Sequence, residues 1–433
     1  MDICFRKSLC APALIQEIYQ YFLTIPDPRN LHIEKAAPFV NHLMCGLAIF
    51  GLKFPSLLQY DRKRKEQIIE KNLKNLYHVD FAPSDTYLRE RLDELDPDVF
   101  RPAFKTVIGQ LQRGKCLEEF AFMDGHYLLA LDGTGHFHSN EIGCASCCTK
   151  KHKNGSIEYY HNMLGACLVH PNKSNVIPFC PEMIKIKMDK IKMIAKKNAS
   201  KRFLEKFRKD YPCLKVIVIE DGISSNGPHI LHLEQYHMKY LLVAKPGDHE
   251  YLFDLFDHSA DAEYTEVWDE KGSAHQFKFL NNVSLNKTHK DLKINLLEYR
   301  QTDKKGKEIY FSWVTNIPIT KDNVYQLMKG ARSRWKIENE TFNTLKTLGY
   351  NFEHNYGHGK HYLSTVFCLL MMLSFLIDQT QEIACKAFQE AKRYQGTYYG
   401  LWETMRILFQ YIEITSWESF FRIITKKNDL NST

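Results

Sequence analysis

The 433-residue sequence lacks the features that mark secreted, membrane-spanning and repetitive proteins. No basic segment followed by an apolar one occurs near its start, so we expect no signal peptide. The apolar stretches 43–52 and 363–377 are shorter than the ~18 residues of a membrane span, and we expect both to be buried core helices. Twelve cysteines without a secretory signal indicate free thiols or metal ligands in a reducing compartment, which predicts a cytoplasmic protein that is not bound to a membrane.

Strong overall charge is also absent, because the formal net charge is only +7. The positive residues are nevertheless concentrated. Residues 185–209 contain eleven Lys or Arg against two acidic residues, a local surplus that exceeds that of the whole chain. Such a stretch favours a polyanionic partner such as nucleic acid, although a solvated helix face is the alternative. The residues expected to grip a phosphate backbone without reading sequence are Lys196, Lys197, Lys201 and Arg202.

The order of expected elements predicts an α/β fold with a mixed sheet. Residues 1–118 are expected to be helical, with Ser84 capping one helix and residues 59–74 forming another. Strands and helices alternate over 119–249, after a turn at Asp124-Gly125. Residues 250–318 are predicted to form a β-rich insertion. Helices return over 319–378, which completes the core, and 379–433 forms a helical C-terminal region.

Three acidic residues have the settings expected of a metal site. Asp132 and Asp221 each follow an apolar run at an expected strand end, and Glu338 lies on an expected helix one turn after Arg334. Two strand-end carboxylates and one helical carboxylate can hold a pair of Mg²⁺ ions for phosphodiester chemistry. Each residue alone is typical of a turn or of a helix-surface ion pair, and Asp124 is assigned to a turn only.

Four segments together resemble the bacterial insertion-sequence DDE transposases, in particular the cut-and-paste group with a β insertion before the catalytic Glu. They are Leu131-Asp132-Gly133-Thr134, Tyr159-Tyr160-His161, Asp221-Gly222 and the string from Trp335 to Lys346. The resemblance covers roughly residues 84–364. It implies a ribonuclease-H-like core in which Asp132, Asp221 and Glu338 are catalytic and bind two Mg²⁺ ions, for which Mn²⁺ can substitute.

The same resemblance implies that Arg334, Arg332 and Lys346 contact DNA. It further implies Mg²⁺-dependent strand cleavage at the element ends followed by strand transfer into target DNA, by a homodimer on paired ends. Recognition of the terminal repeats is assigned to residues 1–118. A nuclease of the same fold without strand transfer, and a catalytically inactive DNA-binding remnant, are the alternative functions.

Departures from the family pattern fall around Glu338. Ala331 stands where the group carries Tyr, and Leu345 stands where it carries Lys. Lys346, one position later, is offset from Glu338 by about 80° on an ideal α-helix unless a bulge corrects it. Glu340 is an alternative metal ligand, although Lys336 instead of Arg334 precedes it by one turn.

A Cys- and His-rich segment follows Asp132. Cys144-x-x-Cys147 is a chelating pair, but a second such pair is lacking. A structural zinc site and a loop with free thiols both fit this segment, and the candidate zinc ligands are Cys144, Cys147, Cys148 and His152. The loop around His354, His358 and His361 is expected to connect a helix end to the core helix, or to touch phosphate above the active site.

Overall fold

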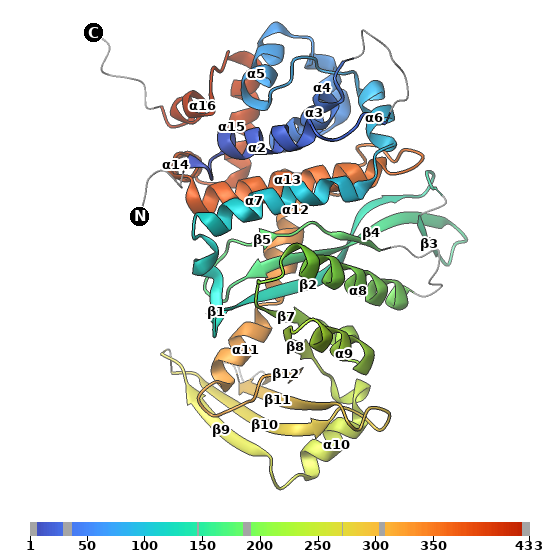
Figure 1. The fold of residues 1–433 in the computed structure, drawn as a ribbon, viewed down its shortest axis with the longest axis vertical. Helices are drawn as coiled ribbons and strands as arrows, with labels where there is room; N and C mark the ends of the chain where they lie inside the picture. Colours follow the sequence, from blue (N-terminus) through green and yellow to red (C-terminus); the bar gives the residue numbers. More distant parts are fainter. Residues whose placement is uncertain are drawn as a thin grey trace.

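The structure is a computed structural model that describes residues 7–28, 37–144, 147–184, 192–270, 272–302 and 308–426. A twelve-stranded mixed sheet runs along the molecule, with a helical layer at one end and strands β9–β12 at the other (Figure 1). The order of the principal strands is β3-β4-β2-β7-β8-β12-β11-β10-β9. The fold is therefore mixed α/β, as the sequence predicted.

Helices from both ends of the chain make up the helical layer. The N-terminal ones are α2 (Ala11–Phe22), α3 (Phe39–Gly51), α4 (Leu57–Lys63), α5 (Gln67–Tyr77), α6 (Asp85–Asp93) and α7 (Arg101–Arg113), with short 3-10 helices at Pro97–Phe100 and Leu117–Phe120. The C-terminal ones are α13 (Leu363–Ala384), α14 (Lys386–Gln395), α15 (Tyr398–Tyr411) and α16 (Trp417–Ile424). The Asn72 amide donates to the carbonyls of Phe409 and Ile412, so the two helical regions form one body.

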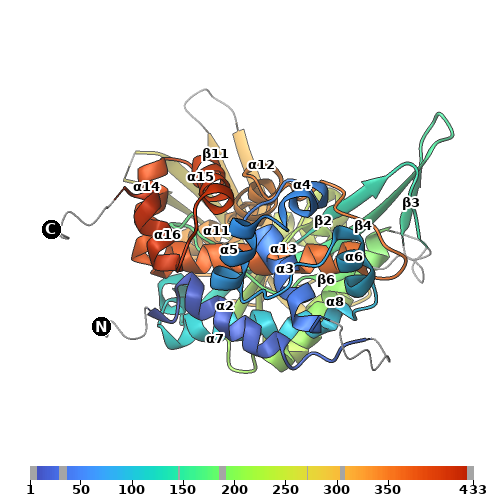
Figure 2. The same ribbon diagram turned by 90° about the horizontal axis from the view of Figure 1, so that it is seen from above.

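Helix α13 is the central element of this layer and packs against α3, α6 and α7 (Figure 2). It has 22 residues and, among the described residues, is the one helix long and apolar enough to cross a membrane; 94% of its apolar window is buried inside the protein. The helix extends beyond the expected 363–377 because its polar continuation is buried too. Asp378 in that continuation forms a buried ion pair with Lys53 and accepts a hydrogen bond from the Tyr350 hydroxyl (2.6 Å).

The core of the sheet is built from the chain between the helical regions. Its strands are β1 (Ala121–Met123), β2 (His126–Ser139), β3 (Cys148–Lys151), β4 (Ile157–Val169), β5 (Ile177–Pro178), β6 (Glu182–Ile184), β7 (Val216–Glu220) and β8 (Lys239–Val243). Strands β2, β7 and β8 are parallel, and β4 runs antiparallel to β2. The connecting helices are α8 (Lys192–Asp210) and α9 (Gly227–Gln235). Every residue of β7 is buried, as expected for a parallel strand covered on both faces.

The β-rich segment is an extension of this sheet. It contains β9 (Glu263–Trp268), β10 (Ala274–Ser284), β11 (Lys293–Thr302) and β12 (Glu308–Thr315), which all lie within the residues predicted to be β-rich. Strand β12 pairs antiparallel with β8, so the segment continues the core sheet. Helix α10 (Glu250–His258) was not predicted; it forms because Leu252, Phe253 and Phe256 recur at helical spacing and are buried. The chain then continues through α11 (Val324–Arg332), a π-helix (Ile337–Asn343) and α12 (Thr344–Thr347).

Some local predictions are confirmed and others are wrong. Ser84 caps α6 by accepting a hydrogen bond from the Tyr87 N–H, as predicted. The single helix expected over 59–74 is wrong: α4 ends at Lys63, and Arg64 beyond it binds the carbonyl of Ala82. Between β4 and α8 the strands expected within 119–249 are the two short strands β5 and β6. Part of the basic stretch, 185–191, lies outside the described residues.

Candidate active site and a nearby cysteine–histidine cluster

Strand pairing brings Asp132 and Asp221 to the same level of the sheet. Strands β2 and β7 are paired in parallel up to Ala130 and Ile219, and the same register continued by two residues puts Asp221 beside Asp132. Asp221 follows β7, as predicted, and accepts a hydrogen bond from the N–H of Ile223. Asp132 does not end its strand. It lies within β2, because β4 continues to pair with β2 after β7 has ended.

Lys196 from α8 connects the two carboxylates. Its ammonium donates to Asp132 Oδ1 (2.9 Å) and to Asp221 Oδ2 (2.6 Å). We expected Lys196 to grip a phosphate backbone, but in this structure it is bound between two acidic side chains. One cationic atom therefore touches both strand carboxylates.

Glu338 joins the same cluster through Arg334. The guanidinium Nη1 of Arg334 lies 2.9 Å from Asp132 Oδ2 and 2.8 Å from Glu338 Oε1. Among the described residues Glu340 has no ion pair, and the nearby Lys336 directs its ammonium to the carbonyl of Lys173 (2.6 Å). Three carboxylates from distant parts of the chain and two cations thus form one connected group.

The helix that carries Glu338 is wound as a π-helix over Ile337–Asn343. A π-helix takes more residues per turn than an α-helix, and a π-bulge adds one residue to the turn. The eighth residue after Glu338 then takes roughly the angular place of the seventh, within about 20° of the Glu on an otherwise α-helical path. The winding accounts for the one-residue displacement of Lys346 noted in the sequence.

A close contact with the sheet positions this helix. Gly165 of β4 is the pairing partner of Asp132, and a Cβ at Gly165 would lie 2.8 Å from the ring of Phe342. The hydroxyl of Thr341 contacts the sulfur of Cys167 on the same strand (3.6 Å). The π-helix therefore rests directly on β4, beside the position of Asp132.

The charges in the cluster reinforce one another. Burial acts to raise the pKa of Asp132, but the ammonium of Lys196, the Gly133 N–H and the guanidinium of Arg334 outweigh it and hold that pKa below its ordinary value. Burial likewise acts to lower the pKa of Lys196 and of Arg334, while their acidic partners raise both above the usual range. At neutral pH the Asp132 carboxylate is ionised and both cations are protonated.

The other residues of α8 expected to bind DNA differ in their surroundings. Arg202 donates to Glu182 Oε1 (2.8 Å) and to the carbonyl of Met183, so it is engaged within the protein. Lys201 is exposed and Lys197 is half-buried. Within the described ranges, neither of these two lysines has an ion pair.

The two cations assigned to DNA on the helical side also have partners. Arg332 lies over the ring of Phe311 (5.5 Å to the centroid) and packs against the extended sheet. Lys346 forms an ion pair with Glu353 (2.8 Å) that is partly open to solvent. Both residues are partly exposed.

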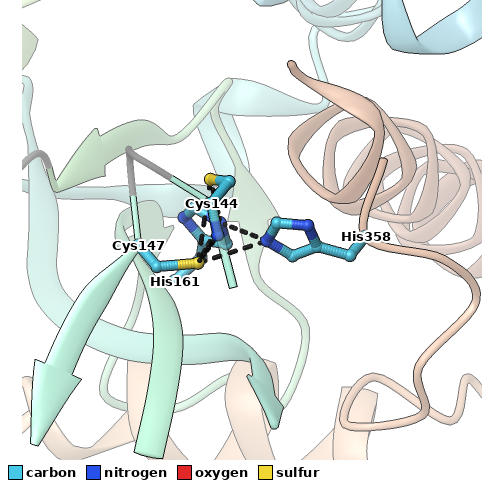
Figure 3. A group of neighbouring side chains, drawn as sticks. All are labelled: Cys144, Cys147, His161 and His358. Carbon is cyan, nitrogen blue, oxygen red and sulfur yellow. Dashed lines mark hydrogen bonds between the residues drawn. The ribbon is translucent and has the colours of Figure 1, made fainter. Parts of the chain in front are cut away.

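The cysteine–histidine cluster consists of Cys144, Cys147, His161 and His358, whose ligand atoms all lie within 4.8 Å of one another. Figure 3 shows His358 reaching toward the two cysteines from the segment that precedes α13. Burial and the neighbouring His358 lower the pKa of His161 to about 4, so its imidazole is neutral at neutral pH.

Two of the four candidate zinc ligands, Cys148 and His152, lie outside this cluster. Cys148 begins β3 and is buried, and the His152 imidazole pairs with Glu158 (3.0 Å). The sequence analysis missed His161 and His358 as members of the cluster. His161 stood in the Tyr159-Tyr160-His161 string, and His358 in the loop expected to connect a helix to the core helix, where the structure places it.

Comparison with known proteins yields little. No protein-family model matches the chain, and no curated protein matches it. Among solved structures, the chain is similar to a piggyBac transposase in a synaptic complex with hairpin DNA, with a TM-score of 0.41 and 11% sequence identity. That similarity covers 100% of this chain and 86% of the other.

Proposed function

We propose that the protein is a DNA transposase that cuts a DNA strand at the ends of its element and joins the freed 3′-hydroxyl to target DNA. The observation that carries the proposal is the convergence of Asp132, Asp221 and Glu338 on one group, tied together by Lys196 and Arg334. Carboxylates gathered from two neighbouring parallel strands and a helix are the arrangement needed for two-metal phosphodiester chemistry.

The order of the core strands supports a ribonuclease-H-like core. The sequence β4–β2–β7–β8 has one antiparallel strand beside β2 and two parallel strands on its other side, with α8 and α9 in the connections. Asp132 lies on the central strand, and Asp221 follows its parallel neighbour. In this fold, the inserted strands β9–β12 separate Asp221 from the helix of Glu338 along the chain.

The donor set fits Mg²⁺ or Mn²⁺, both of which prefer carboxylate oxygens. Because the single ammonium of Lys196 touches Asp132 and Asp221, these two side chains are close enough to share a cation. Two bound Mg²⁺ ions would stabilise the charge that develops on the phosphate and the departing oxygen. Asp132, Asp221 and Glu338 would hold the ions, and Lys196 and Arg334 would then be released to bind the DNA phosphates.

DNA is the partner that this reaction requires. Lys197, Lys201 and Lys346 would contact the backbone near the cut, and the N-terminal helices would recognise the terminal repeats. A homodimer on paired ends would bring both cuts together. These assignments follow from the family resemblance and from the accessibility of the three lysines.

The test is a cleavage assay on DNA that bears the ends of the parent element, with Mg²⁺ or with EDTA. We expect Asp132→Asn, Asp221→Asn and Glu338→Gln each to reduce cleavage by about 100-fold or more while DNA binding persists. Asp124→Asn, in the exposed turn, and Glu340→Gln are matched controls that should retain activity. If the wild-type protein cleaves DNA but does not transfer strands, it is a nuclease. If it binds DNA but does not cleave it, it is an inactive DNA-binding protein. Full activity of the three site variants would disprove the site.

A further inference from the structure

The atoms of the cysteine–histidine cluster are spaced like the corners of a zinc site. Zinc bonds of about 2.3 Å to sulfur and 2.0–2.1 Å to nitrogen give a regular tetrahedron with edges of about 3.8 Å (S–S), 3.6 Å (S–N) and 3.3 Å (N–N). The sulfurs of Cys144 and Cys147 lie 3.7 Å apart, and the Nε2 atoms of His161 and His358 lie 3.1 Å apart. Three sulfur–nitrogen distances are 3.2, 3.3 and 3.8 Å.

The tautomer of His358 suits a metal ligand. Its Nδ1 lies 2.8 Å from the carbonyl oxygen of Gly359, which can only accept a hydrogen bond, so Nδ1 carries the proton. In the neutral imidazole, Nε2 then has a free lone pair, and this atom faces Cys147 and His161. A backbone carbonyl that fixes the tautomer of a ligating histidine in this way is a common second partner in zinc sites.

The loop that carries His358 is held in place independently of the cluster. The carboxylate of Asp93 accepts hydrogen bonds from four consecutive backbone N–H groups, residues 360–363. Gly359 has a positive φ of +71°, and a Cβ there would lie 2.2 Å from Asp93 Oδ1, so only glycine fits. His358 is therefore presented to the cluster by a constrained backbone.

We propose that Cys144, Cys147, His161 and His358 bind one structural Zn²⁺ ion. Two thiolates and two imidazoles suit Zn²⁺ and do not suit Mg²⁺, so this site is chemically separate from the carboxylate group. The ion would join β4 and the segment before β3 to a loop some 200 residues later in the chain. It would close a long loop and so fix the chain that follows Glu338 against the strands that carry Asp132.

Metal content measured on the full-length protein tests the proposal. We expect one Zn²⁺ per chain in the wild type after extensive buffer exchange, and loss of that zinc in Cys147→Ser and His358→Gln. His152→Gln and Cys213→Ser are the controls: His152 pairs with Glu158 and Cys213 is an exposed free cysteine, so both variants should keep a full equivalent. Glu338→Gln should also keep its zinc, which separates this result from a failure of the catalytic proposal.

A second measurement does not depend on the folding of the variants. Replacement of Zn²⁺ by Co²⁺ in the wild-type protein should produce the visible absorption of tetrahedral cobalt with thiolate charge-transfer bands. Wild-type protein that contains no zinc and gives no such spectrum would overturn the proposal. A Cys144–Cys147 disulfide in protein prepared under reducing conditions, or loss of zinc from the His152 and Cys213 controls, would overturn it too.

Discussion

Replacement of Asp93 by Asn tests how the loop before α13 is held. Asp93 Oδ1 accepts the N–H groups of His361, Tyr362 and Leu363, each at 2.9 Å, and Oδ2 accepts that of Lys360 at 2.7 Å. The N–H groups of Tyr362 and Leu363 belong to the N-cap and first residue of α13, which have no acceptor within the helix, and those of Lys360 and His361 belong to the loop before it. One side chain thus binds four consecutive N–H groups where the loop meets the central helix.

The expected cost of Asp93→Asn follows from these four bonds. If the amide oxygen of the introduced Asn keeps three N–H partners, its amide nitrogen faces the Lys360 N–H. Both groups are donors, so no hydrogen bond forms between them. A donor left without a partner costs about 1–3 kcal/mol when it is fully buried, and the Lys360 N–H is partly buried. The remaining bonds are weaker because the acceptor has lost its charge. We expect the free energy of unfolding at pH 7 to fall by about 1–3 kcal/mol.

The pH dependence gives a second readout. Burial acts to raise the pKa of Asp93, but the four N–H groups outweigh it and lower that pKa below its ordinary value. A lowered pKa contributes stability above the unfolded-state value of about 3.9, and this stability is lost as the pH falls through the folded-state pKa. The difference in the free energy of unfolding between the wild type and Asp93→Asn should therefore be constant above about pH 5 and shrink below pH 4.

Urea unfolding from pH 7 to pH 3.5 measures both effects. Asp80→Asn is the matched control, because Asp80 forms an ion pair with Lys74 in which both side chains are about two-thirds exposed. Exposed pairs contribute about 0–1 kcal/mol, so this variant should resemble the wild type. If Asp93→Asn is as stable as the wild type at pH 7, or if the difference in the free energy of unfolding is the same at pH 3.5 as at pH 7, then the Asp93 carboxylate does not stabilise this loop.

Two further substitutions test the packing around the sites. Asp378→Ala should lower the free energy of unfolding by about 3–5 kcal/mol, because it leaves the buried ammonium of Lys53 without a counter-charge. The double variant Lys53→Met with Asp378→Leu should recover much of that stability, because no buried charge is left. If the double variant is as unstable as Asp378→Ala, the prediction is wrong. Gly165→Ala should cost about 1–3 kcal/mol and reduce DNA cleavage further than stability alone explains, because the new Cβ pushes on Phe342 and on the helix of Glu338. Adding Phe342→Leu to Gly165→Ala should restore both stability and DNA cleavage. Unchanged cleavage in Gly165→Ala would show that this contact does not position the helix.

The strands that place the aspartates could be predicted because their sequence pattern is local. The run Val216–Ile219 is apolar throughout, as a buried parallel strand requires, and Asp221 follows directly after the end of that strand at Glu220. The inserted strands could be found for the same reason. Their attachment to β8 could not, because pairing between strands distant in sequence leaves no local signal.

The surroundings of Glu338 were only partly predictable. The i,i+4 spacing of Arg334 and Glu338 indicated their contact, but the second contact of Arg334, with Asp132, depends on how the helix docks. That docking rests on a missing side chain, at Gly165, and on the π-helical winding. Ideal α-helical geometry offsets Lys346 from Glu338, and the sequence indicated that a bulge could correct the offset but not that the helix is wound as a π-helix over Ile337–Asn343.

The cysteine–histidine cluster shows why spacing along the chain can mislead. Cys148 begins β3 and is buried, and it is not among the residues that Cys147 joins in the cluster. The other two members of the cluster, His161 and His358, come from β4, which pairs beside Cys148, and from a loop far along the chain. A Cys-x-x-Cys pair is local and visible in the sequence, whereas ligands that close a long loop are fixed by the tertiary fold. The half of the ligand set that the sequence missed is therefore the half through which a bound ion would join distant parts of the chain.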